Sequence, residues 1–121
     1  MHSNLELIEK SNYLNIFTPF ITEKKVYKVF SAENNAMNSG FINDTPKNAL
    51  ILSEKVALKE HKLIQSSYGY VFELENSEFI FRDVENVFDK VIEVSVREIQ
   101  KITTINKALV KNIYKVIKRT F

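Results

Sequence analysis

Apolar and polar residues alternate with period two on both sides of a short polar stretch in residues 68–82, which read YGYVFELENSEFIFR. Alternation of this kind is typical of strands that bury one face. The pattern predicts a β-hairpin whose buried face carries Tyr70, Phe72, Leu74, Phe79 and Phe81. With a turn at Asn76 and Ser77, Leu74 lies opposite Phe79; a loop over residues 75–78 is compatible with the same pairing.

Three further segments have the composition or the alternation of strands. Residues 25–31 (KVYKVFS) are rich in β-branched and aromatic side chains, and residues 49–52 form a short apolar run typical of a buried strand. In residues 91–96, apolar and polar side chains alternate without a break. Together with the hairpin, these segments predict an antiparallel sheet of four to five strands.

Helical periodicity marks both ends of the chain. Ser3 and Glu6 have the spacing of a capping box, so we expect a helix over residues 4–17 that ends before Pro19. Toward the C-terminus, one side of a helical wheel collects the apolar residues Ile102, Ile105, Leu109, Val110, Ile113, Val116 and Ile117. This pattern predicts a long amphipathic C-terminal helix, whose opposite side carries the lysine stripe Lys107, Lys111, Lys115 and Lys118.

Residues 54–65 (EKVALKEHKLIQ) fit either a helix capped by Ser53 or imperfectly alternating strands. With a helix there, the protein is a helix-rich α+β sandwich. With strands, it becomes a strongly bent, mostly antiparallel sheet closed by the C-terminal helix. In that case the run EVSVREIQKI, residues 93–102, is similar to the last strands of bacterial pleckstrin-homology or GRAM-like domains, which implies lipid or protein binding.

The length of 121 residues suits one domain with one core. We therefore predict that residues 1–121 form a single α+β domain. It has an antiparallel sheet of four to five strands, an N-terminal helix, and the long amphipathic C-terminal helix packed on one sheet face.

Composition excludes several classes of chemistry. The chain has no cysteine, which removes disulfides, thiolate catalysis and thiolate zinc sites. It has only two glycines, and phosphate-cradling loops and nucleophile elbows need glycine for close backbone approach. Two histidines, His2 and His61, are too few for a structural zinc site. We expect no enzyme activity, no cofactor and no metal.

No apolar run reaches the length of a membrane span, and the N-terminal residues lack a secretory signal pattern, so the sequence predicts a cytoplasmic protein. The wealth of lysine, isoleucine and asparagine is typical of an AT-rich genome, such as that of a low-GC bacterium or a phage. In the asparagine-rich segment 33–48, the apolar residues Phe41 and Ile42 either tuck onto the core or anchor a partner.

Charge is divided along the chain. Residues 71–98 hold eight acidic and three basic residues, whereas residues 99–121 hold six basic residues and no acid. An acidic sheet region beside a basic segment favours binding of another protein. We predict a non-catalytic protein-binding module, such as a small inhibitor, immunity or adaptor protein, that binds through Glu73, Glu75, Glu78, Phe41 and Ile42.

Two other functions use different surfaces. The lysine stripe is spaced to follow a phosphate backbone, which predicts non-specific nucleic-acid binding as the alternative. A pleckstrin-homology-like domain would bind lipid or protein. A homo-oligomer is a further candidate assembly.

Overall fold

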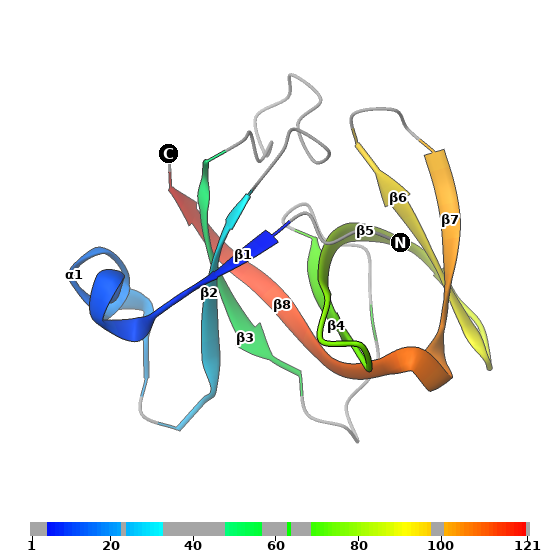
Figure 1. Cartoon of the computed structure of the whole chain (residues 1–121), viewed down its shortest axis with the longest axis horizontal. Coiled ribbons are helices and arrows are strands. Elements are labelled where there is room, and N and C mark those ends of the chain that lie inside the picture. The colour runs from blue at the N-terminus through cyan, green and yellow to red at the C-terminus, as the bar shows by residue number, and fades with distance from the viewer. Residues whose placement is uncertain are drawn as a thin grey trace.

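The computed structural model describes residues 5–22, 24–32, 48–56, 63, 69–97 and 101–120, and most of these residues lie in β-strands (Figure 1). The strands are β1 Leu5–Ile8, β2 Tyr27–Ala32, β3 Leu50–Lys55, β4 Tyr70–Leu74, β5 Phe79–Val87, β6 Val91–Val96, β7 Lys101–Asn106 and β8 Val110–Thr120. Helical structure in these ranges is limited to the single turn α1, Leu14–Phe17, and the 3₁₀ turns Lys10–Asn12, Thr18–Phe20 and Lys107–Leu109.

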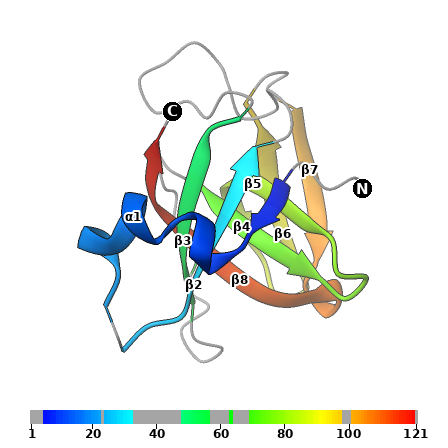
Figure 2. The same cartoon turned by 60° about the vertical axis from the view of Figure 1, so that its left-hand side comes forward.

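All of these strands join one antiparallel sheet in the order β1-β2-β3-β8-β4-β5-β6-β7. The sheet curls into a half-barrel, in which β1 comes back into contact with β5 (Figures 1 and 2). β8 is shared between two neighbours, because its first half pairs with β4 and its second half with β3. β5 is shared in the same way: residues 79–82 pair with β4 and residues 83–87 with β6.

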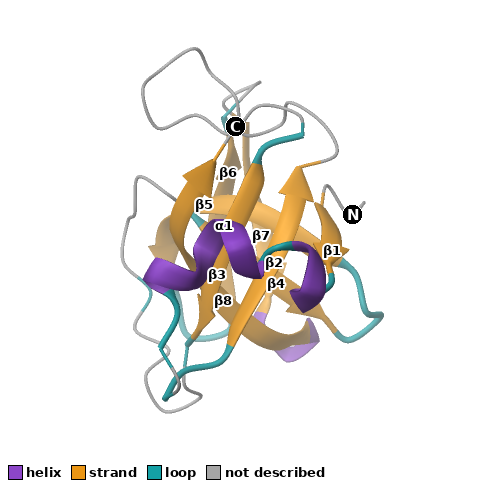
Figure 3. Ribbon diagram, turned by 90° about the vertical axis from the view of Figure 1, so that its left-hand side faces the viewer, coloured by secondary structure: helices purple, strands orange, loops and turns teal. Residues whose placement is uncertain are grey.

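Three apolar clusters cover the two faces of this sheet. The inner face of the half-barrel encloses the barrel core, made of Leu5, Phe30, Ala32, Ile51, Val71, Phe81, Tyr114 and Val116. The outer face carries the hairpin core under β6 and β7, made of Leu63, Tyr70, Phe72, Leu74, Ile80, Val84, Ile92, Val94, Ile105 and Ile113. Where α1 crosses β2 and β3, Tyr13, Phe17, Val29 and Leu52 form the helical-turn core (Figure 3).

The predicted hairpin is confirmed as β4 and β5, but its register differs by one residue. Phe72 lies opposite Ile80, and Val71 lies opposite Phe81. Residues 75–77 form a three-residue loop, one residue longer than the predicted turn and one shorter than the alternative loop: Ser77 adopts the left-handed region with a φ of 69°, and the Leu74 N–H donates to the Glu78 carbonyl. A slip of one residue moves a strand's side chains to the other face. Phe81 therefore faces the barrel core rather than lying beside Phe72.

The predicted C-terminal helix is wrong, and with it the α+β fold class and the sheet of four to five strands. Residues 101–106 and 110–120 are strands β7 and β8. Ile113 and Tyr114 are consecutive and both buried, because Ile113 enters the hairpin core and Tyr114 the barrel core. A strand buried on both faces has no period-two alternation, so its apolar residues can imitate a helical arc. β-branched side chains, abundant in this segment, favour the strand.

The predicted N-terminal helix over residues 4–17 is also wrong. Leu5 is buried and pairs with β2 as the first residue of β1, and the helical part shrinks to α1 and two flanking 3₁₀ turns. Pro19 lies at the start of the second 3₁₀ turn, which agrees with an α-helix that ends before it. Asn12 and Asn15 are weak helix formers, so packing of Tyr13 and Phe17 determines the local structure.

The remaining strand predictions agree with β2, β3 and β6 to within a few residues. Ser53 does not cap a helix: it lies within β3, and its hydroxyl donates to the Lys28 carbonyl at 2.8 Å. Most of residues 54–65 lie outside the described ranges. The structure resembles the strongly bent antiparallel alternative, but the helix that closes that alternative is replaced by β8. Among the described helical segments, none has the length and apolar character needed to cross a membrane.

Gly69 sits where no other residue fits. Its φ is +82°, and a β-carbon added there would overlap the Phe81 ring and approach the Arg82 carbonyl at 3.2 Å. We expect Gly69→Ala to lower the free energy of unfolding by about 2–4 kcal/mol, because overpacking and left-handed backbone strain add. Chemical denaturation measures this loss.

Ser77→Gly is the matched control, since Ser77 also has a positive φ but lies exposed in the β4–β5 turn. Glycine relieves strain there, so stability should stay constant or rise by a few tenths of a kcal/mol. Equal losses for both variants would contradict the assigned backbone at Gly69.

Candidate functional site

The three acids predicted to bind a partner do not form one patch. Glu73 is 8% exposed and lies on the inner face of β4. Glu75 is exposed, and its N–H donates to the Leu109 carbonyl at 2.8 Å. Glu78 is half-buried beyond the turn. The other two predicted contact residues, Phe41 and Ile42, lie outside the described residues. Of the predicted acids, Glu75 is thus the most open to a partner.

Glu73 is held by a buried polar network in the barrel core. The Asn112 side chain donates to its carboxylate at 2.8 Å, and the Tyr114 hydroxyl is hydrogen-bonded to it as well. Burial, reinforced by the charge and hydrogen bond of Glu73, raises the pKa of Tyr114 to about 12. Lys28 places its ammonium 5.2 Å from the Phe79 ring centre and 5.4 Å from that of Tyr114. Asn112 and Tyr114 give Glu73 the hydrogen-bond partners that a buried carboxylate requires.

The lysine stripe of the predicted helix does not exist as a stripe. A strand rises roughly 3.3 Å per residue against 1.5 Å in a helix, so β8 spreads the charges over about twice the predicted length. Lys115 lies opposite Glu54, which forms an ion pair of 3.0 Å with Lys25. The Lys118 ammonium makes a cation–π contact with Phe20, 5.1 Å from the ring centre. The charge density that favoured a phosphate backbone is therefore lower than predicted.

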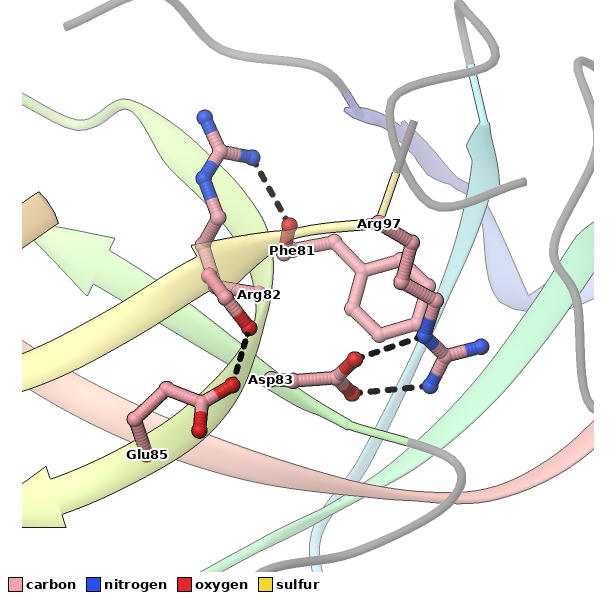
Figure 4. A network of polar contacts seen from close by, with 6 residues as sticks. Phe81, Arg82, Asp83, Glu85 and Arg97 are labelled. Atoms are coloured by element: carbon pink, nitrogen blue, oxygen red, sulfur yellow. Dashed lines mark hydrogen bonds and ion pairs between the residues drawn. The ribbon is translucent and has the colours of Figure 1, made fainter. Parts of the chain in front are cut away.

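A second polar cluster fixes the bend of β5 against the end of β6 (Figure 4). The Arg97 guanidinium donates two hydrogen bonds to the Asp83 carboxylate, at 2.7 and 2.8 Å. The Ser95 hydroxyl donates to Glu85 at 2.7 Å. Desolvation lowers the pKa of Arg82, whose guanidinium donates to the Phe81 carbonyl. The bidentate geometry and partial burial of the Asp83–Arg97 pair are typical of a structural clamp.

β7 is the last strand of the sheet formed by the described residues. The Lys107 N–H donates to the Lys90 carbonyl at 2.9 Å, which shows which residues of β7 form the hydrogen-bonded pairs with β6. In an antiparallel ladder the bonded residues alternate, so residues 101, 103 and 105 bond to β6. The backbone N–H and C=O groups of Ile102 and Thr104 consequently point away from β6, and no described strand pairs with them.

Exposed apolar side chains occur on β7 and in the two connections beyond its C-terminal end. In the described residues, Ile102 is 56% exposed on β7, Leu109 is 55% exposed just beyond it, and Phe88 is 50% exposed in the β5–β6 turn. One hydrogen bond joins the connection after β7 to the β5–β6 turn: the Lys107 N–H donates to the Lys90 carbonyl. Ile102 lies opposite Ser95, toward the other end of β7, so these side chains are spread along the β6–β7 pair rather than gathered in one patch.

No protein-family model, curated protein or solved structure matches the chain. The candidate site therefore depends on the geometry of its own residues. Among the described acidic residues, no group of three or more could hold a metal ion; His2 and His61 lie outside the described ranges.

The sequence missed β7 as a candidate site because edge position depends on the order of strands in space. Lys101–Asn106 was assigned to a helix, although its two isoleucines and two threonines favour a strand. That β-branched run was the one local signal that could have revealed it.

The Tyr114–Glu73 contact predicts how stability changes at alkaline pH. Tyrosine titrates near pH 10 in the unfolded chain and near 12 in the fold, so the folded state holds the proton more tightly. The stabilisation is complete below about pH 10 and is lost as the pH rises through about 12. We expect wild type to lose about 2–3 kcal/mol more than Tyr114→Phe over this interval, measured by urea unfolding.

Comparison with Tyr114→Phe isolates the contribution of the Tyr114 hydroxyl from that of all other ionisable groups. Absorbance of tyrosinate should show a transition near pH 12 in the wild type that Tyr114→Phe lacks. A variant that removes only a transition near pH 10 would contradict the buried contact with Glu73.

Proposed function

We propose that this protein is a non-catalytic protein-binding module that adds an extended segment of its partner to the open edge of β7. The observation that carries the proposal is the outward direction of the Ile102 and Thr104 backbone groups. Unpaired N–H and C=O groups in a row form a template for another strand. A small inhibitor, immunity or adaptor protein would use such an edge.

Comparison of the two sheet edges favours β7. β1 has four residues, and it lies in contact with β5 at the seam of the half-barrel. β7 has six residues, contains no proline, and pairs with β6 without a register shift. Natural edges are usually shortened, bulged, charged or covered to prevent pairing. Among the side chains of β7, Lys101 provides the one charge that could serve this purpose.

The side chains of β7 also suit strand addition. Ile102 and Thr104 lie on the exposed face of the strand, and Ile105 anchors the opposite face in the hairpin core. A partner residue paired beside Ile102 would cover an isoleucine that is 56% exposed in the isolated chain. β-branched cross-strand pairs contribute about 0.2–1 kcal/mol each, in addition to the backbone bonds.

The exposed acid Glu75 belongs to the same end of the molecule, since its backbone bonds to Leu109 just beyond β7. It is the one residue of the originally predicted acidic contact that supports this placement. The non-catalytic part of the proposal rests on composition, namely the absence of cysteine and the scarcity of glycine.

Proline at position 104 tests the proposal. The Thr104 N–H points to the open edge, so Thr104→Pro removes a donor that the β6–β7 ladder does not use. Thr104→Val keeps the donor and the β-branched shape. Tagged wild-type protein and tagged Thr104→Val should each capture one stoichiometric partner from nuclease-treated lysate. Thr104→Pro should capture at least tenfold less of that partner.

Thermal unfolding controls for the fold of both variants. Retention of the partner by folded Thr104→Pro would show that β7 is not the binding edge. If lysate yields only the bait, the same pair of variants is compared by light scattering: a dimer lost only in Thr104→Pro assigns the edge to self-association.

A further inference from the structure

A small apolar pocket lies on the outer face of the sheet, away from the backbone edge of β7. Its volume is about 120 Å³. It is formed between the β5–β6 turn and the first half of β8, and its lining consists of Leu63, Val87, Ile92, Lys107, Val110 and Ile113.

The pocket opens to solvent at Val87, which is 39% exposed, while Ile92 and Ile113 at its base are almost fully buried. Its volume indicates what it can hold. A dry protein cavity of roughly 150 Å³ accommodates benzene, so this smaller space suits the branched end of an aliphatic chain, about four carbons, with the rest of the chain in the open mouth.

Lys107 supplies the one charged group in the lining. Its backbone is held on both sides: its N–H donates to the Lys90 carbonyl at 2.9 Å, and the Asn106 side chain accepts from the Ala108 N–H at 2.9 Å. The ion pairs in the described part of the chain are Lys25–Glu54 and Arg97–Asp83, and neither involves Lys107. A pocket lined by five apolar side chains and one lysine, which has no carboxylate partner among the described residues, is complementary to an aliphatic anion.

We propose that this pocket binds a small branched aliphatic carboxylate. The aliphatic end packs among Val87, Ile92 and Val110, and the carboxylate pairs with the Lys107 ammonium. This site is separate from the strand-binding edge and does not depend on it. The ligand covers Val87, and it neutralises a lysine that has no carboxylate partner among the described residues.

Isocaproate is the probe, titrated into isotopically labelled full-length protein and followed by amide chemical shifts. We expect saturable shifts at residues 87, 92, 107, 110 and 113, with a dissociation constant in the millimolar range. The neutral analogue isocaproamide should bind about fivefold more weakly, because a partly exposed ion pair contributes on the order of 1 kcal/mol. Phenylacetate tests the size limit and should not saturate the same residues.

Two variants locate the ligand. Val87→Phe fills the pocket from its exposed rim and should abolish the saturable shifts. Lys107→Gln should reduce the affinity for isocaproate about fivefold and remove its advantage over isocaproamide. Lys111→Gln is the matched control, since Lys111 is exposed, carries the same charge and is not part of the lining. It should bind as wild type.

Equal binding of acid and amide, or unchanged binding in Lys107→Gln, would overturn the assignment of the carboxylate. Absence of saturable shifts in the wild type would overturn the site as a whole. If Val87→Phe disturbs the fold, the comparison of Lys107→Gln with Lys111→Gln still shows whether isocaproate binds beside Lys107. Thr104→Pro should bind isocaproate as wild type, so failure of this site and failure of the β7 proposal are distinguishable.

Discussion

The architecture depends on the burial of β4 and β8 on both faces. Val71 and Tyr114 are register partners that face the barrel core, and Phe72 and Ile113 are the next pair and face the hairpin core. Because the side-chain period of a strand is two, a slip of one residue would exchange the contents of the two cores. The two clusters differ in composition and shape, so each constrains the register that the other requires.

This double burial explains the one charged residue in β4. Glu73 occupies a position on the inner face where every neighbour along the strand is buried. Removal of a carboxylate from water is unfavourable unless donors replace the solvent. Asn112, its register partner, and Tyr114 provide those donors, so the acid becomes part of the interior. A negative charge counted along the sequence is therefore a poor guide to the charge that a partner meets.

The elements that the sequence predicted correctly have one buried face, a short β-branched or apolar run as in β2 and β3, or a clear polar turn. β6 alternates between buried Ile92 and Val94 and the more polar side, and the β4–β5 hairpin has a clear polar turn. The C-terminal half was mistaken because Ile113, Tyr114 and Val116 bury opposite faces of one strand, which erases the alternation. Of the candidate site, the sequence provided Glu75, while the edge of β7 and the pocket depend on strand order and could not be seen.

The two proposed sites share a structural cause. β6 and β7 connect to the half-barrel through the second half of β5, and the Asp83–Arg97 clamp fixes the angle of that connection. The pair holds β5 and the end of β6 together at the base of this β5–β7 unit. Its open side is the β7 edge, and its underside covers the pocket near Lys107. The barrel core supplies stability, and the β5–β7 unit carries the two proposed binding surfaces.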